Sequence, residues 1–333
     1  MATTTVAPPI FIDTATLRSI LTYKNLINHF QTSLPTASST IQSPIRQTHQ
    51  TSPTSSLILM PSWSLSPSSL PYIGVKLVTH HPHNSSLNLP GIHACYVLFN
   101  SQTGQTLASM DGTELTLYRT SCVSALASLY LSRQDSQVLA MIGAGSLAPH
   151  LIKAHLTSRP NIKKVMIWNR SAAKARSLVE KMRKEEEFEG IGFESSERLE
   201  EAVGEADIVS CATNSEEALV KGAALKEGAH LDLVGSFKHS MRECDDEAIR
   251  RGRVFVDNDA AAVEAGELVG AFERGVISPN EIAGKLVELI EGDKVGRRDL
   301  KEITVFKSVG SAVVDVLSAQ LVYETFMNGR SLS

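Results

Sequence analysis

The sequence has few cysteines, few aromatic residues and no long apolar run. Its four cysteines stand far apart in 333 residues, and none forms a Cys-x-x-Cys pair: Cys95, Cys122, Cys211 and Cys244. This pattern excludes a disulfide-dense scaffold and a zinc site of clustered cysteines, so we expect reduced thiols. No apolar stretch approaches the roughly 18 residues that a membrane-spanning helix needs, so we expect a soluble protein without a membrane partner.

Acidic residues are scarce in the first 125 residues. This segment holds three acids and five bases, a net charge of +2, whereas the remainder holds 33 acids and 27 bases, a net charge of −6. The whole chain, at −4 with a pI near 6.2, does not match a general nucleic-acid binder. A region with separated cations and few carboxylates suits an anionic small molecule, although a neutral Ser/Thr-rich surface would have the same composition.

The N-terminal segment contains no secretory signal. Residues 1–9 lack an apolar core, and strand-like sequence begins at Ile10. A Ser/Thr-rich, acid-poor beginning is also typical of organelle transit peptides. We therefore expect a cytoplasmic protein, with the plastid (chloroplast) as the alternative.

The pattern of apolar residues changes near Asp135. The first third has mixed α+β character, whereas short β-branched runs then alternate with charged helical stretches. Such alternation predicts an α/β fold with a doubly wound parallel sheet. Strands are expected at 138–142, 165–169, 208–213, 230–234, 254–257 and 303–306, and helices at 146–156, 172–187, 197–203, 244–251, 260–274, 279–291 and 310–326.

A glycine-rich turn joins the first of these strands to its helix. Residues 143–148 read Gly-Ala-Gly-Ser-Leu-Ala and fit the pattern G-x-G-x-x-A. The first glycine permits a tight turn, the second lets the backbone approach a pyrophosphate, and the helix N-terminus attracts the phosphate charge. We predict a dinucleotide site whose members include Gly143, Ala144, Gly145, Ser146 and Leu147.

The end of the second strand indicates which dinucleotide binds. NAD-preferring proteins place an acidic residue there, but this chain has Asn169, Arg170 and Ser171. An arginine with two small polar residues suits a 2′-phosphate, so NADPH is predicted and NADH is less favoured. Two further strand ends, at Thr213 and at Val234 with Gly235, are expected to line the cofactor site, and Val234 and Gly235 are suited to lie against the nicotinamide ring.

Taken with segments elsewhere in the chain, these motifs resemble the ornithine cyclodeaminase/mu-crystallin family, and its plant ketimine reductases in particular. The similarity spans about residues 10–327 and includes Ser-Pro-Ile-Arg at 43–46, Gly-Val-Lys at 74–76, Arg-Thr at 119–120 and Phe-Lys-Ser-Val-Gly at 306–310. It implies a homodimer in which a Rossmann domain (129–308) is inserted into a substrate-binding and dimerisation domain (1–128 with 309–333).

The resemblance also implies the substrate site. Arg46, Lys76 and Arg119 would hold the carboxylate of an amino-acid-like substrate, with Lys76 and Arg119 catalytic. Thr120, Ser308 and Gly310 would complete the cofactor site. An arginine can hold a carboxylate with two parallel hydrogen bonds, which would fix the plane of the substrate.

Two departures from the family pattern bear on the reaction. Phe237 stands where cyclodeaminases have an aspartate used in deamination, and Ile58 stands where they have a glutamate for the substrate's side-chain amine. Both changes favour an apolar pocket for a cyclic imine carboxylate. We therefore predict NADPH-dependent reduction of Δ1-piperideine-2-carboxylate to pipecolate, or of its five-membered analogue.

Two alternatives remain open: an ornithine cyclodeaminase, and a non-catalytic NADPH-regulated binding protein like the crystallins. No metal is expected. Consecutive histidines such as His80 and His81 point to opposite faces of a strand, and no cysteine or carboxylate lies near them in sequence.

Overall fold

The computed structural model describes residues 8–66, 70–87 and 89–330, and it divides into two compact units. Unit 1 comprises residues 1–119 and 311–333, and unit 2 comprises residues 120–310. The boundary falls inside helix α3 (Gly112–Leu131). Residues 1–7, on which much of the plastid alternative depends, lie outside the described residues. Within the described ranges, no helix is both long and apolar enough to cross a membrane.

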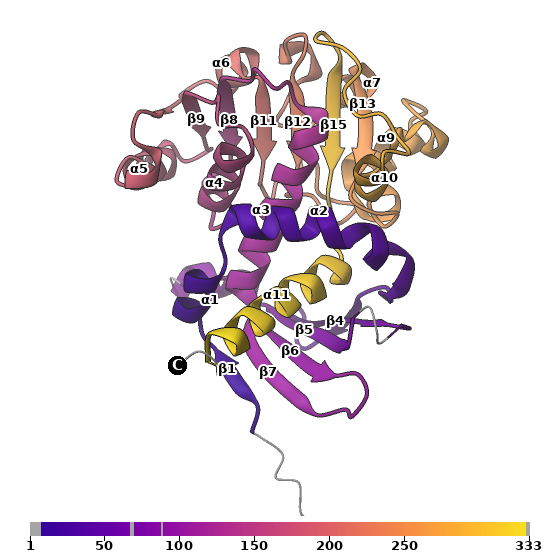
Figure 1. Cartoon of the computed structure of the whole chain (residues 1–333). Coiled ribbons are helices and arrows are strands. Elements are labelled where there is room, and N and C mark those ends of the chain that lie inside the picture. The colour runs from indigo at the N-terminus through magenta and orange to yellow at the C-terminus, as the bar shows by residue number, and fades with distance from the viewer. Residues whose placement is uncertain (1–7, 67–69, 88, 331–333) are drawn as a thin grey trace, which may run out of the picture. The chain divides into compact units, whose positions relative to one another are not determined.

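Unit 2 is built on an eight-stranded parallel sheet. Its spatial order is β10-β9-β8-β11-β12-β15-β13-β14, and every pairing in it is parallel. Figure 1 shows the middle strands side by side. The strands are β8 (Val138–Ile142), β9 (Lys164–Trp168), β10 (Gly192–Ser195), β11 (Ile208–Cys211), β12 (His230–Leu233), β13 (Gly252–Val256), β14 (Gly284–Lys285) and β15 (Ile303–Lys307).

Helices cover both faces of this sheet. Alternate residues of a strand point to opposite sides, and in β8 both sets of residues are apolar and pack against helices. Leu139 and Met141 of β8 belong to one apolar cluster, with α4 (Ala148–Ser158) and α5 (Ala172–Met182). Ala140 and Ile142 belong to another, with α6 (Leu199–Glu205), α7 (Asp246–Arg251) and α9 (Gly266–Glu273). The predicted doubly wound α/β fold is therefore confirmed.

Unit 1 contains a second, largely antiparallel sheet. Its strands β4 (Ser56–Ser64), β5 (Tyr72–His80), β6 (Ile92–Asn100) and β7 (Thr106–Asp111) pair in sequence order. Short strands flank them: β1 (Ile10–Ile12) pairs parallel with β7, while β2 (Ile41–Gln42) and β3 (Gln47–Gln50) pair with β4. The helices are α1 (Thr14–Ile20), α2 (Tyr23–Thr40) and α11 (Ala312–Arg330), and α11, yellow in Figure 1, packs on β4 and β5.

Two expected helices are interrupted. The stretch 260–274 forms α8 (Ala261–Glu264) and α9, separated by Ala265 in an extended conformation. The next residue, Gly266, packs so closely that an added Cβ would lie 2.1 Å from the Met241 carbonyl oxygen. The stretch 279–291 forms a short turn, the edge strand β14 and α10 (Leu286–Glu291), because Gly284 and Lys285 pair with β13. Strand β10 was not predicted.

Candidate active site

The glycine-rich turn follows β8 directly. Gly143 has a φ of +112°, a conformation that favours glycine, and its N–H donates to the Trp168 carbonyl (2.8 Å). An added Cβ at this position would lie 2.5 Å from the Ala212 carbonyl oxygen. Gly143 is therefore required by the fold itself, because neighbouring backbone crowds it.

Gly145 has a different environment. An added Cβ there would meet no heavy atom within 4 Å, so the space beside this glycine is open. It lies just before α4, whose N-cap residue Leu147 makes no side-chain capping bond, and buried Ala148 begins the helix. The open space and the helix dipole fit the pyrophosphate of a dinucleotide.

The turn after β9 is held against this loop. The side-chain oxygen of Asn169 accepts a hydrogen bond from the Ala144 N–H (3.2 Å), and its amide donates to the Ser171 carbonyl (3.1 Å). Arg170, between them, is exposed. Asn169 therefore ties the two loops together, and the guanidinium of Arg170 lies in solvent where it can meet an anion.

Two strand ends meet on one carboxylate. The N–H of Thr213 donates to Oε1 of Glu243 (2.7 Å), and the N–H of Gly235 donates to Oε2 (2.7 Å). Glu243 is fully buried, and this burial raises its pKa to about 7. Val234 is also buried. Glu243 lies in an irregular loop before α7 and belongs to no motif that the sequence analysis identified.

A second carboxylate holds the segment after β15. Asp257 Oδ2 accepts from the N–H groups of Val309 (3.1 Å) and Gly310 (2.7 Å), and Gly310 has a φ of +78°. Ser308 is buried, and its N–H donates to the Leu233 carbonyl (3.1 Å). The candidate cofactor residues of unit 2 thus lie at the carboxyl ends of the strands or just beyond, except Thr120, which lies in α3.

In unit 1 three cations surround one carboxylate. Asp315 of α11 lies with Oδ2 2.7 Å from Nζ of Lys76 on β5, and with Oδ1 2.9 Å from Nε of Arg119 on α3. Asp315 is fully buried, and Lys76 and Arg119 are 2% and 7% exposed. Arg46, between β2 and β3, lies close enough to act electrostatically on both Lys76 and Asp315.

The charges of this cluster shift its titration. Burial, with the repulsion of Arg119, lowers the pKa of Lys76 to about 8, although Asp315 opposes that shift. Burial acts to raise the pKa of Asp315, but Arg119 and Lys76 together outweigh it and hold that pKa below its ordinary value. With Asp315 ionised, three cations and one anion carry a net charge of +2, which suits a further anion.

The sheet register explains how Lys76 meets this helix. Lys76 pairs with Met60 on β4 and with Tyr96 on β6, and alternate residues of a strand share a face. Ile58, two residues before Met60, therefore lies on the same face as Lys76. The sequence suggested a helical position for Asp315 but not its partners, because its neighbours come from the far end of the chain.

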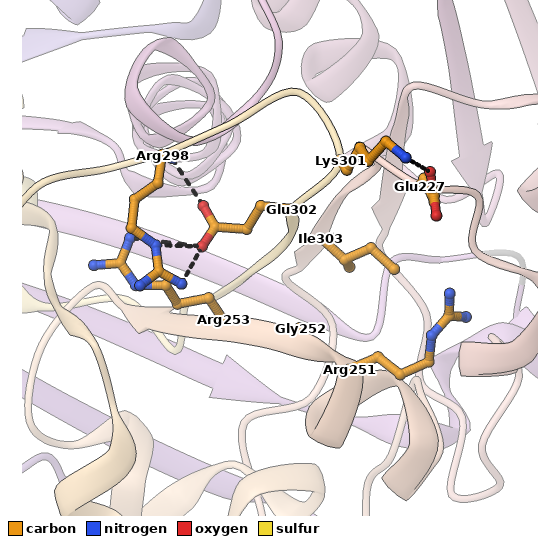
Figure 2. Close-up of a pocket in the computed structure, with 8 residues that line it drawn as sticks. All are labelled: Glu227, Arg251, Gly252, Arg253, Arg298, Lys301, Glu302 and Ile303. Carbon is orange, nitrogen blue, oxygen red and sulfur yellow. Dashed lines mark hydrogen bonds and ion pairs between the residues drawn. The ribbon is translucent and has the colours of Figure 1, made fainter.

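A separate pocket lies at the amino-terminal ends of the parallel strands. Figure 2 shows that its residues gather around the beginnings of β13 and β15, whereas the glycine-rich turn follows the end of β8. Its charged side chains are largely paired: Arg298 with Glu302 (2.6 Å) and Lys301 with Glu227 (3.5 Å). None of the predicted site residues lines this pocket.

None of the four cysteines, all of which lie in the described part of the chain, forms a disulfide. Cys122, Cys211 and Cys244 are buried, and burial raises the pKa of each thiol. Among the residues that the structure describes, no group of three or more His, Cys, Asp or Glu side chains could hold a metal ion.

Comparison with known proteins identifies the family. The profile of the ornithine cyclodeaminase/mu-crystallin family matches residues 10–330. Protein SAR DEFICIENT 4 of Arabidopsis thaliana is 61% identical over 322 residues, which cover 97% of this chain and 99% of that protein. The expected similarity to a plant member is thereby confirmed.

Solved structures of related enzymes resemble this chain over nearly its whole length. The chain resembles Thermococcus litoralis Δ1-pyrroline-2-carboxylate reductase in complex with NADH and L-proline, at a TM-score of 0.90, 32% identity and coverage of 96% of this chain and 98% of that one. It also resembles an archaeal alanine dehydrogenase dimer with bound NAD, at a TM-score of 0.87, 28% identity and 97% coverage of both chains. The predicted oxidoreductase class is confirmed. The chain belongs to the ornithine cyclodeaminase/mu-crystallin family.

Proposed function

We propose that this protein reduces a cyclic ketimine carboxylate with NADPH, converting Δ1-piperideine-2-carboxylate to pipecolate. The observation that carries this proposal is the cluster of Lys76, Arg119 and Arg46 around the single carboxylate of Asp315. Its surplus of positive charge, in a buried setting, is suited to a carboxylate ligand.

The nicotinamide cofactor belongs to unit 2. When bound, it supplies a hydride to the imine carbon. Its pyrophosphate would lie at Gly143, Ala144, Gly145, Ser146 and Leu147, and its nicotinamide end beside Thr213, Val234, Gly235, Ser308 and Gly310, with Thr120 of α3 as a further contact. The Thermococcus relative binds NADH. In this chain exposed Arg170, between Asn169 and Ser171, supports NADPH instead, because a guanidinium pairs with a 2′-phosphate.

Proton supply is assigned to Lys76 or to water. Reduction of a C=N bond adds a hydride to carbon and a proton to nitrogen. A Lys76 ammonium with a pKa near 8 is a stronger acid than an ordinary lysine, and Asp315 holds it in place at 2.7 Å. Arg119 and Arg46 would hold the substrate carboxylate, so that binding and orientation provide most of the acceleration.

The two departures from the cyclodeaminase pattern support an imine substrate. Ile58 shares a sheet face with Lys76, so an aliphatic side chain lies where a diamine substrate would need a polar partner. Phe237 is 39% exposed on the loop after β12 and offers an apolar surface instead of a carboxylate. Ornithine cyclodeamination is therefore disfavoured. A five-membered ring is the second candidate, because the Thermococcus relative is a pyrroline-2-carboxylate reductase.

One assay tests the proposal. The purified protein is mixed with NADPH and Δ1-piperideine-2-carboxylate or its five-membered analogue, and loss of absorbance of the reduced cofactor is followed. We expect oxidation of NADPH with formation of the cyclic amino acid. Tight NADPH binding without oxidation would favour a binding protein like the crystallins, and ammonia released from ornithine would favour a cyclodeaminase.

We further propose a homodimer in the cytoplasm, with the plastid as the alternative compartment. The archaeal alanine dehydrogenase of the same fold is a dimer. In this arrangement, residues 1–128 and 309–333 form the substrate-binding and dimerisation domain, and residues 129–308 the cofactor domain. Size measurement by light scattering tests the dimer.

A further inference from the structure

Glu243 joins two neighbouring strands at the point where their pairing ends. The last regular pair of β11 and β12 is Cys211 with Leu233. Two residues further on, Thr213 and Gly235 direct their N–H groups to the two oxygens of Glu243, each at 2.7 Å. The carboxylate therefore replaces the missing strand pairing at this edge of the sheet.

The position of Glu243 is itself fixed by backbone bonds. Its carbonyl oxygen accepts from the N–H groups of Leu219 (3.1 Å) and Val220 (2.9 Å), and its side chain is fully buried. The hydroxyl of Thr213 also donates to Oε1 at 3.0 Å. With its backbone anchored and three donors on its oxygens, the carboxylate has little freedom to move.

Gly235 is shaped to this carboxylate. An added Cβ would lie 2.1 Å from the Thr213 carbonyl oxygen and 2.5 Å from Oε1 of Glu243. A larger residue would force the two strand ends apart. Gly235 and Glu243 therefore together keep the ends of β11 and β12 close to each other.

A buried ion pair lies nearby and balances charge. Lys307, at the end of β15, lies with Nζ 3.0 Å from Oε1 of Glu267 on α9, and both residues are fully buried. Lys307 also attracts Glu243 electrostatically, whereas Glu267 repels it. Glu243 is thus held by its hydrogen bonds to Thr213 and Gly235 and by attraction to Lys307.

From these contacts we propose that Glu243 is a positioning residue for hydride transfer. It fixes the spacing of Thr213 and Gly235, the strand ends against which the nicotinamide ring would lie. This inference rests on the proposed function. Glu243 itself needs no contact with substrate or cofactor, because it acts through the two backbone segments that it holds.

The substitution Glu243→Gln tests this role. Glutamine keeps one acceptor oxygen, but its NH2 group cannot accept from a backbone N–H, so one of the two strand ends loses its partner. At saturating NADPH and imine we expect kcat to fall about tenfold or more, because misplacement of reacting groups is costly. The KM for NADPH should change less than about threefold, since the phosphate-binding residues are untouched. Glu243→Asp, which keeps the charge but cannot span both N–H groups, should show the same split.

Asp207 provides a matched control. Its Oδ2 accepts from the N–H groups of Gln137 (2.7 Å) and Val138 (3.0 Å). These residues lie at the amino-terminal end of β8, whereas Glu243 lies at the carboxyl ends of β11 and β12. Asp207→Asn also replaces a carboxylate that accepts two backbone N–H groups by an amide. It should lower the melting temperature, while kcat stays within about twofold of the wild-type value.

The outcomes separate the two proposals. Wild-type protein that oxidises NADPH, with unchanged kcat in both Glu243 variants, would overturn the positioning role alone. Equal losses of kcat in Asp207→Asn and Glu243→Asp would also overturn it, because the effect would be general destabilisation. Wild-type protein without turnover would overturn the proposed function and this inference together.

Discussion

The carboxylate of Asp315 lies 2.7 Å from the ammonium of Lys76, and both groups are buried in unit 1. They come from distant parts of the chain, Lys76 from β5 and Asp315 from α11. This ion pair holds the position of the lysine on which the proposed reaction depends and favours its charged form.

Removal of Asp315 should cost both stability and activity. Asp315→Asn leaves the buried cations of Lys76 and Arg119 without their partner, which typically costs about 3–5 kcal/mol. The free energy of unfolding in denaturant checks this. Glu114→Gln is the control, because it also breaks an ion pair (2.8 Å), but its partner Arg18 is 60% exposed and water can replace the carboxylate. Equal losses in both variants would contradict the idea that burial matters.

The pH dependence of activity should report Lys76. Its pKa is lowered to about 8, mainly by burial, so the ammonium loses its proton as the pH rises through 8. We expect kcat/KM to fall about tenfold per pH unit above that value. In Lys76→Arg the charge persists to much higher pH, so this limb of the profile should disappear even if activity is low. An unchanged limb in the arginine variant would assign it to the substrate imine.

Arg170 should determine cofactor preference. Arg170→Asp replaces a cation by an anion beside the expected 2′-phosphate, and hydrogen bonds to charged groups contribute about 1.5–3 kcal/mol. The KM for NADPH should therefore rise at least about tenfold, while the KM for NADH changes little. Arg198→Asp, an exposed arginine before α6, is the control for total charge. Equal changes for both cofactors would refute the assignment.

Substitution by alanine should have different effects at the two glycines of the glycine-rich turn, Gly143 and Gly145. Gly143→Ala meets neighbouring backbone and a positive φ, so it should lower the melting temperature of the cofactor-free protein. Gly145→Ala meets open space and should leave that temperature unchanged. It should nevertheless raise the Kd for NADPH about tenfold, because the methyl group occupies the space for the pyrophosphate. Calorimetry with and without NADPH distinguishes these effects.

His230 should make the fold sensitive to acid. It is fully buried on β12, its Nδ1 lies 2.9 Å from the Thr304 hydroxyl, and burial lowers its pKa to about 3. The folded state therefore favours the neutral ring, so stability present above about pH 6.5 is lost as the pH falls toward 3.

This group alone should remove about 1.4 kcal/mol per pH unit in that range. Denaturant unfolding at several pH values should show a shallower loss in His230→Gln. Exposed His93→Gln is the control and should follow the wild type. Identical pH slopes in wild type and His230→Gln would refute the effect.

The sequence predicted local features well and long-range neighbours poorly. The turn at Gly143 follows from residues adjacent in the chain, and so does the alternation of strands and helices. The pairing of Asp315 with Lys76 depends on the return of α11 to the first sheet, which no local pattern encodes. Strand β10 (Gly192–Ser195) was missed because its glycine, glutamate and serine give it little strand character.

Placement of β15 shows the same limit. The sequence predicts a strand at 303–306, but no local pattern shows that β15 lies between β12 and β13. The order of strands depends on how the whole chain closes on itself. Glu243 was missed for a related reason, because its role arises only when β11 and β12 end side by side.

The division of unit 1 between the two ends of the described chain has a consequence for synthesis. Unit 2 is continuous, from residue 120 to residue 310, so a ribosome releases all of it before α11 appears. Domains generally fold as units while the chain emerges. Unit 2 can therefore fold early, whereas Lys76 and Arg119 lack the counter-ion Asp315 until α11 has been synthesised. Translation that stops before α11 would leave a dinucleotide fold whose partner half lacks its central carboxylate.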